Sequence, residues 1–245
     1  MKFPLVKFEI NKTLDKEVCL NFIDAKINGY DFGKERIISE HPELKGIRGK
    51  KKSEMKKKIF QYVDSYYKIH EKEIKNSLKK TKKVWEKIEK KYFQELQKIF
   101  GNLQFYRPRI IMVYLSIFKC GVLCKDGKSF QIWYKTANKE PAEVKRHMAH
   151  EILHLYYYAY LKKHGYKTLL KDWNHAEIFN MIILNLPQFK NLTSKEEFGY
   201  PIHRRRFKKF KKLWQKTQKI DQYLSFLKLE YRVGLTKREK KKKIK

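Results

Sequence analysis

The sequence contains little of what marks secreted or membrane-spanning proteins. Its 3 cysteines are an odd number among 245 residues, and Cys120 and Cys124 lack the C-x-x-C spacing of redox and zinc-knuckle motifs. We therefore expect Cys19, Cys120 and Cys124 to be free thiols in a reducing compartment. Signal-like starts, apolar runs of membrane-spanning length, internal repeats, glycine-rich phosphate loops and the G-x-S-x-G motif are also missing. These absences predict a cytoplasmic protein with no membrane partner.

Acidic residues are scarce as well, with 26 against 59 basic residues and a net charge of +33. Such a charge attracts polyanions, but only 10 of the 59 basic residues are arginine, and lysine occurs throughout the chain. We therefore expect weak, nonspecific nucleic-acid contact, with the Lys-rich tail at 237–245 contributing in proportion to its charge. Residues 203–214 interleave basic and aromatic residues. They could bind phosphates and bases, but the pattern favours a basic amphipathic helix with Phe207, Phe210 and Trp214 facing the core.

The feature that carries chemistry is an H-E-x-x-H motif formed by His150, Glu151 and His154. Four residues are just over one helical turn, so both imidazoles can reach one metal ion while Glu151 lies beside it. Neutral imidazole is a good zinc ligand, and a neighbouring carboxylate can take a proton from the water that a metal activates. The motif predicts a zinc site with Glu151 as the general base.

The flanking residues place this motif in a capped helix from Pro141 to His164. Proline suits the first helical position, Glu143 lies near the positive end of the helix dipole, and Gly165 ends the helix. Apolar residues occupy most sides, so we expect the helix to be largely buried. Its buried imidazoles need partners, which a metal would supply; two core histidines bonded to carbonyl groups are the alternative.

A zinc site of this kind needs a third protein ligand, and the next predicted helix, from Asp172 to Leu186, offers two. Glu177 lies 23 residues after His154, and His175 lies 21 after it. Residues two apart on a helix point roughly 200 degrees apart, so only one of them can face the ion. We favour Glu177, which shares a polar face with two asparagines, over His175, which lies on a packing face.

The motif and the glutamate on a following helix resemble the zincin metallopeptidases, in particular the gluzincin branch. The aspartate of that branch, expected four residues after the glutamate, is Met181 here, with Asn180 as the nearest polar substitute. A second resemblance, to the SprT-like branch, would make His175 the third ligand. The resemblance covers about residues 105–203. It implies zinc as the cofactor and a peptide or protein as the substrate.

Strand-like segments precede the metal helix. Residues 109–118 are rich in branched and aromatic side chains, and residues 121–134 have the pattern of a hairpin around Asp126 and Gly127. We expect a small antiparallel sheet packed on the H-E-x-x-H helix. By the resemblance, residues 130–134 would be the strand that pairs with an extended substrate, with an ordinary sheet edge as the alternative. The resemblance also implies that Tyr200 or His203 stabilises the oxyanion, unless both are surface residues of a turn.

The predicted fold is α+β, with a zincin-like core at 102–203. An N-terminal segment with a long helix or helix pair, broken near Asn76 and Ser77, precedes this core at 1–101, and a basic helix and tail follow at 204–245. The predicted function is zinc-dependent peptide hydrolysis. The alternatives are a non-catalytic nucleic-acid-binding protein with a structural H-E-x-x-H, and a SprT-like protease acting on proteins bound to nucleic acid.

Overall fold

The computed structural model describes residues 3–27, 29–106, 108–170 and 172–227. The predicted Lys-rich tail at 237–245 lies outside these ranges. The chain forms two compact units: one has the bounds Met1–Lys90 and Pro108–Glu151, the other Lys91–Arg107 and Ile152–Lys245. We call the first the sheet unit and the second the helical unit. Each combines segments that are far apart in sequence.

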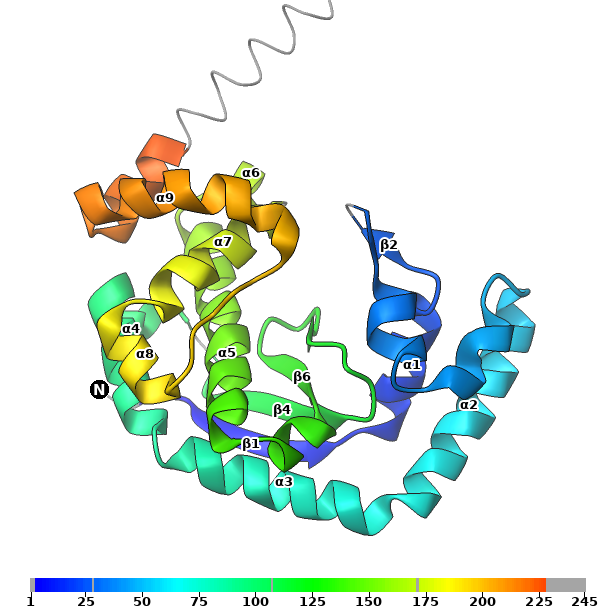
Figure 1. Ribbon diagram of the computed structural model, residues 1–245. Coiled ribbons are helices and arrows are strands. Elements are labelled where there is room, and N and C mark those ends of the chain that lie inside the picture. Colours follow the sequence, from blue (N-terminus) through cyan, green and yellow to red (C-terminus); the bar gives the residue numbers. More distant parts are fainter. Residues whose placement is uncertain (1–2, 28, 107, 171, 228–245) are drawn as a thin grey trace, which may run out of the picture. The chain divides into compact units, whose positions relative to one another are not determined.

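The sheet unit contains a four-stranded sheet in the order β1-β4-β6-β5 (Figure 1). Its strands are β1 (Leu5–Ile10), β4 (Ile110–Ser116), β5 (Val122–Leu123) and β6 (Ser129–Trp133). β1 and β6 both pair in parallel with β4, whereas β5 pairs antiparallel with β6. All of β6 is buried, as expected of a strand with neighbours on both sides. A second, two-stranded sheet pairs β2 (Lys26–Ile27) with β3 (Tyr30–Asp31).

The expected strands and hairpin are present, but the prediction of an antiparallel sheet was wrong for two of the three pairings. The hairpin turns at Gly127, whose φ of +65° is a conformation that glycine adopts without strain. The other pairings could not be predicted from alternation, which shows that a strand exists but not which segment lies beside it. Here β1, from the start of the chain, occupies one side of β4, and β6 returns parallel on the other.

The expectation that residues 130–134 form an edge of the sheet was wrong for Phe130 and Gln131, which pair with Leu123 and Val122 of β5. β6 lies between β4 and β5, and β5 is the edge strand on that side of the sheet. Tyr134 is not in the strand, because it begins a short 3-10 helix, η4 (Tyr134–Asn138).

The helices of the sheet unit are α1 (Lys12–Phe22), α2 (Lys52–Ile69) and α3 (Glu71–Glu86), together with the short helices η1 (Gly33–Ile38) and η2 (Pro42–Ile47). The long helical segment predicted near 53–100 is present, but its predicted break at Asn76 and Ser77 was wrong, since both residues lie inside α3. The chain instead leaves the helical conformation at His70, with φ −103° and ψ 15°, and α3 ends at Glu86.

A buried carboxylate joins several elements of the sheet unit. Asp15 on α1 is fully buried and accepts hydrogen bonds from the Tyr67 hydroxyl (2.7 Å), the Ile117 backbone N–H (2.9 Å) and the Gln131 amide (2.7 Å). Burial raises the pKa of Asp15 to about 6, and these hydrogen bonds partly oppose the rise. The carboxylate thus links α1, α2, β6 and the end of β4.

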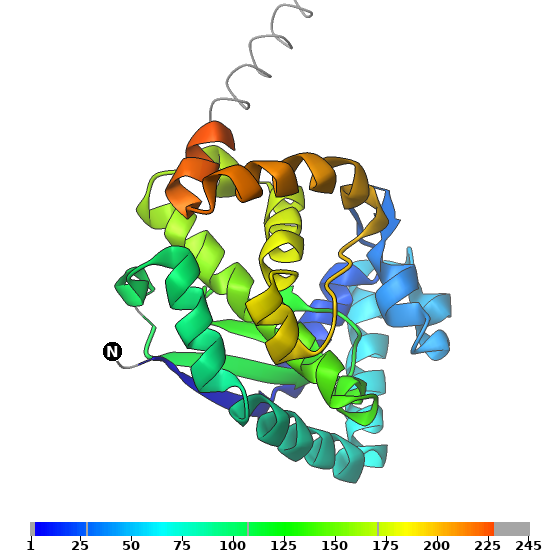
Figure 2. The ribbon, with the colours of Figure 1, turned by 60° about the vertical axis from the view of Figure 1, so that its left-hand side comes forward.

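The helical unit is built around aromatic side chains. Its helices are α6 (Lys167–Leu170), α7 (Trp173–Leu184), α8 (Pro187–Thr193) and α9 (Arg204–Thr217), with the 3-10 helices η3 (Leu103–Phe105) and η5 (Pro201–His203) and a helical stretch at 220–227. α4 (Glu89–Phe100) and α5 (Pro141–Lys163) are continuous helices that begin in the sheet unit and end in this one. Phe179 of α7 stacks on Tyr157 of α5 at 4.4 Å between ring centroids. α9 lies across α7 in both ribbon views (Figures 1 and 2).

Several predictions about these elements are confirmed. The fold is α+β, α5 differs from the predicted motif helix by one residue, and Asp172 caps α7 by accepting a hydrogen bond from the His175 backbone N–H at 3.1 Å. The three cysteines are free thiols, and two of them are buried. Across the described residues, no helix has both the length and the apolar character needed to cross a bilayer.

Candidate metal centre

The H-E-x-x-H motif lies in the middle of α5, where the helix is almost entirely buried. His154 is 3% exposed, and His150, one turn earlier, is partly buried. The apolar residues between them, Ile152 and Leu153, are fully buried. The helix therefore holds the two imidazoles in a fixed relation to one another, as the spacing predicts.

α7 brings a carboxylate to these imidazoles. Glu177 is 4% exposed, and its Oε1 lies 3.1 Å from Nε2 of His154. Each of His150, His154 and Glu177 offers one ligand atom, and the three atoms all lie within 4.8 Å of one another. The group therefore unites both histidines of the motif with a glutamate 23 residues further on, and it does not include Glu151.

The chemistry of this donor set fits zinc. Two imidazole nitrogens and one carboxylate oxygen are ligands that zinc binds at about 2.0 to 2.2 Å in sites that keep a fourth position open. Such bonds place the ligand atoms roughly 3.4 Å apart in a tetrahedral arrangement, close to the observed separation of His154 and Glu177. A buried carboxylate facing two imidazoles also needs a cation or a proton to offset its desolvation.

His175, the alternative third ligand, is held elsewhere in the helical unit. It is 1% exposed; its Nδ1 lies 2.6 Å from the Tyr157 hydroxyl, and its Nε2 lies 3.1 Å from the Tyr223 hydroxyl. Burial lowers the pKa of His175 to about 3, so the ring is neutral. Both nitrogens have hydroxyl partners, and the structure places His175 in the aromatic core rather than with His150, His154 and Glu177.

The Glu151 carboxylate lies close to the backbone of a glycine, Gly121. A Cβ atom at Gly121, just before β5, would lie 2.6 Å from Oε1 of Glu151, which is far inside van der Waals contact. Gly121 thus leaves the space that the Glu151 carboxylate occupies. Sequence reasoning missed this residue, because a glycine before a hairpin strand is common and only the fold brings it to α5.

His203 and Tyr200 lie together beside the first turn of α7. His203 is 1% exposed, and its Nε2 lies 3.1 Å from Oδ1 of Asn174, one turn before Glu177. Burial lowers the pKa of His203, although the carboxylates of Glu177 and Asp172 oppose the change. The ring of Tyr200 packs against Trp173 at 5.1 Å and against His203 at 5.6 Å. Neither residue is among the three potential ligands, and the expectation that His203 is a surface residue of a turn is excluded.

Comparisons of the chain with protein-family models, curated proteins and solved structures found no match. The functional argument therefore depends on the geometry of His150, His154 and Glu177 and on the residues around them.

Proposed function

We propose that the protein is a zinc-dependent peptidase in which His150, His154 and Glu177 hold the ion. The observation that carries this proposal is the convergence of their three ligand atoms within 4.8 Å in the protein interior. Two of the ligands come from one turn of α5 and the third from α7, so rigid helices hold each one.

Glu151 is the proposed general base and acid. It follows His150 directly on α5, and its side chain is only partly buried, which leaves it accessible to water. In peptide hydrolysis Glu151 would accept the proton of the attacking water and then deliver it to the leaving amine. A zinc ion, when bound, would supply Lewis-acid polarisation of the carbonyl and lower the pKa of the attacking water.

The zincin-type core is part of the same proposal. The motif on α5, the glutamate on α7 and the sheet that precedes α5 support it. Two features depart from the expected pattern: Met181 occupies the position four residues after Glu177, and two of the three pairings in the sheet are parallel. The gluzincin-like ligand set is favoured over the SprT-like one, because His175 is engaged by Tyr157 and Tyr223.

For the oxyanion we propose Tyr200 rather than His203. Tyr200 is partly exposed, so its hydroxyl can meet a substrate, whereas His203 is buried against Asn174 and Trp173. His203 is instead a positioning residue, which acts through Asn174 on the turn of α7 that leads to Glu177.

The proposal is tested by metal content and hydrolysis measured on the same preparation. We expect about one zinc per chain when the full-length protein is purified without chelators. Cleavage of an unfolded protein such as casein should stop when a chelator removes the metal and return with added zinc. A protein that stays metal-free in excess zinc would overturn the proposal and favour a nucleic-acid-binding protein with a structural H-E-x-x-H.

A further inference from the structure

The exposed face of α9 carries the densest positive charge among the described helices. Eight of its fourteen residues are Lys or Arg, all eight are exposed, and the helix contains no acidic residue. α3 offers a contrast, because glutamates at both of its ends form the ion pairs Lys75–Glu71 (2.6 Å) and Lys82–Glu86 (3.8 Å). α9 is therefore the helix on which basic residues lie closest together without acidic neighbours, within a chain whose other segments are also basic.

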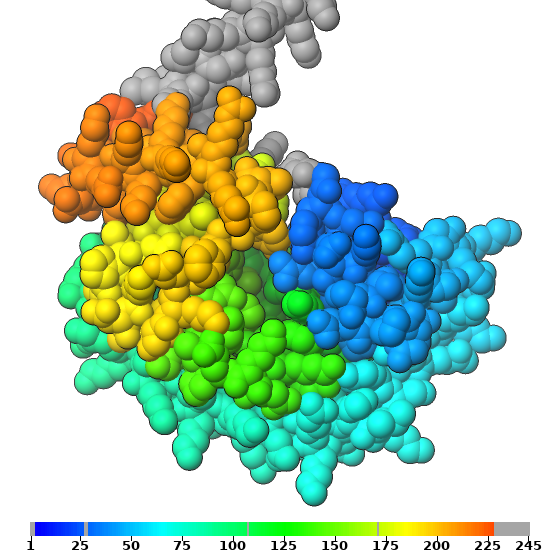
Figure 3. All heavy atoms as spheres, viewed as in Figure 1, coloured from blue at the N-terminus to red at the C-terminus, as the bar shows by residue number. Residues whose placement is uncertain are grey.

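The opposite face of α9 is anchored in the aromatic core of the helical unit. Phe210 is 7% exposed and Trp214 is 4% exposed. The Phe210 ring meets His175 at 5.4 Å between centroids, and the Trp214 ring meets Phe179 at 5.9 Å. The predicted amphipathic helix is confirmed for Phe210 and Trp214, whereas Phe207, also expected to face the core, is only partly buried. The side chains of α9 (orange) project outward in the space-filling view (Figure 3).

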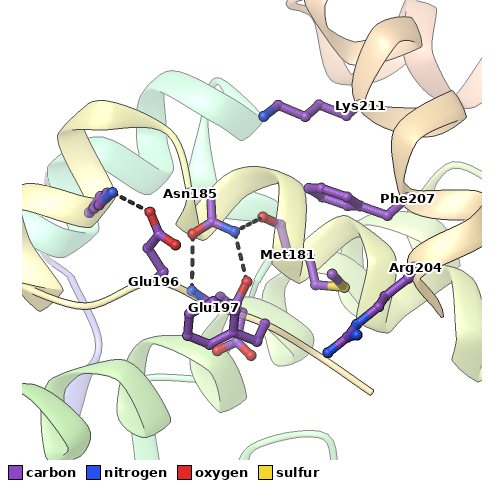
Figure 4. A pocket seen from close by; sticks show the side chains of 9 residues that line it. Met181, Asn185, Glu196, Glu197, Arg204, Phe207 and Lys211 are labelled. Carbon is purple, nitrogen blue, oxygen red and sulfur yellow. Dashed lines mark hydrogen bonds and ion pairs between the residues drawn. The ribbon is translucent and has the colours of Figure 1, made fainter. Parts of the chain in front are cut away.

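A pocket of about 470 Å³ adjoins α9, which is within the range of roughly 300 to 1,000 Å³ found for small-ligand sites. Arg204, Phe207 and Lys211 reach over it from α9, at spacings of three and four that place them on one face of the helix (Figure 4). Phe198 also lines it and is 64% exposed. Cations and aromatic rings therefore meet at one site.

The acidic residues of this pocket have partners within the protein. Glu196 forms an ion pair with Lys190, and the Gly199 backbone N–H donates to Oε1 of the buried Glu197 at 3.1 Å. Arg204 and Lys211 are the other charged residues that line the pocket. The pocket is thus suited to an anionic ligand that also carries a flat ring.

We propose that α9 and this pocket bind single-stranded nucleic acid, with phosphates along the cationic face and a base against Phe198. Phosphate binding by Lys and Arg, combined with stacking on an exposed aromatic ring, is the general mode of single-strand recognition. A lipid surface fits less well, because the apolar face that an interfacial helix would insert is buried against α7. A base paired inside a duplex could not reach Phe198.

The test measures binding of the full-length protein to a fluorescent oligothymidylate by anisotropy, in the presence of chelator, so the outcome does not depend on the proposed zinc site. The variant Arg205→Gln/Lys208→Gln/Lys212→Gln neutralises the middle of the cationic face. Its matched control, Lys79→Gln/Lys80→Gln/Lys83→Gln, removes three exposed lysines of α3. We expect the α9 variant to lose at least tenfold in affinity and its salt slope to fall by about 2, at roughly 0.7 per phosphate contact. The α3 variant should lose less than twofold.

A second variant examines the pocket. Phe198→Ala should weaken oligothymidylate binding about tenfold, leave the salt slope unchanged and leave duplex binding unaffected, because it removes stacking but no charge. Equal losses from the α9 and α3 variants would show diffuse attraction and overturn the proposal. So would an unchanged affinity in Phe198→Ala, or stronger binding to phosphatidylserine vesicles than to the oligonucleotide.

Discussion

Both units of the protein bury carboxylates, and the partners of two of them, Asp15 and Glu177, differ in kind. Asp15 in the sheet unit is surrounded by neutral donors: a phenol, a backbone amide and a side-chain amide. Glu177 in the helical unit faces the imidazole of His154, and its ligand atom lies within 4.8 Å of the ligand atom of His150. Neutral donors satisfy a structural carboxylate without an ion. Imidazoles can instead donate lone pairs to a metal that the carboxylate also binds, so the kind of partner, rather than burial, distinguishes the two sites.

A third carboxylate, Glu151, differs from both, because it is only partly buried and is not one of the three potential ligands. Glu151→Gln should lower hydrolysis by about 10² to 10⁴-fold and leave zinc content unchanged, because the amide cannot accept a proton. Metal analysis and a casein assay on one preparation check both expectations. Asp15→Asn is the control, since it alters a carboxylate that is neither a proposed zinc ligand nor the proposed base. Full activity in the Glu151→Gln variant would remove the proposed base.

The Asp15 carboxylate should be visible in the pH dependence of stability. Its pKa is raised to about 6 in the folded protein from 3.8, so the unfolded chain releases this proton first as the pH rises. Its ionisation therefore lowers the free energy of unfolding as the pH rises from about 4 to about 6. The free energy of unfolding should be unaffected below this range and lower by at most about 3 kcal/mol above it. Denaturant unfolding across this range should show the loss in the wild type and not in Asp15→Asn. Parallel pH curves for the two proteins would contradict the role assigned to Asp15.

The smallest effect is expected from a substitution at Gly121. It tests whether the position of the Glu151 carboxylate matters when the carboxylate itself is kept. Gly121→Ala should displace the Glu151 carboxylate and lower the turnover number about tenfold, because a misplaced base costs rate even when the metal is retained. Gly46→Ala is a matched control, since a Cβ there meets no atom within 4 Å. If the two variants have the same turnover number as the wild type, Gly121 has no positioning role.

The sequence was informative where local spacing sets the geometry. The H-E-x-x-H spacing, the proline at the start of α5 and the Asp172 cap of α7 were enough to predict both helices. Face analysis of α7 also favoured Glu177 over His175, and the structure brings Glu177 to the two motif histidines. These features depend on residues within a few positions of one another, which helical geometry relates directly.

Features that depend on distant segments were not predicted. The parallel pairing of β1 with β4, the hydroxyl partners of His175 and the approach of Gly121 to Glu151 each join residues that no local pattern relates. The break in the long helical segment was predicted at the wrong residues for a similar reason. The apolar periodicity continues through His70, so the sequence pattern does not show that the backbone leaves the helical conformation there.

The most direct test of the proposed metal site compares zinc content in two variants of α7. Glu177→Ala removes a proposed ligand, whereas His175→Phe keeps the size of a buried ring and removes only its bonds to two tyrosine hydroxyls. Metal content should be measured after dialysis against limiting zinc, with circular dichroism to confirm that both variants fold. We expect Glu177→Ala to lose zinc and His175→Phe to retain about one zinc per chain. Retention of zinc by Glu177→Ala together with its loss from His175→Phe would contradict the assignment, and no zinc in the wild type would contradict the metal site itself.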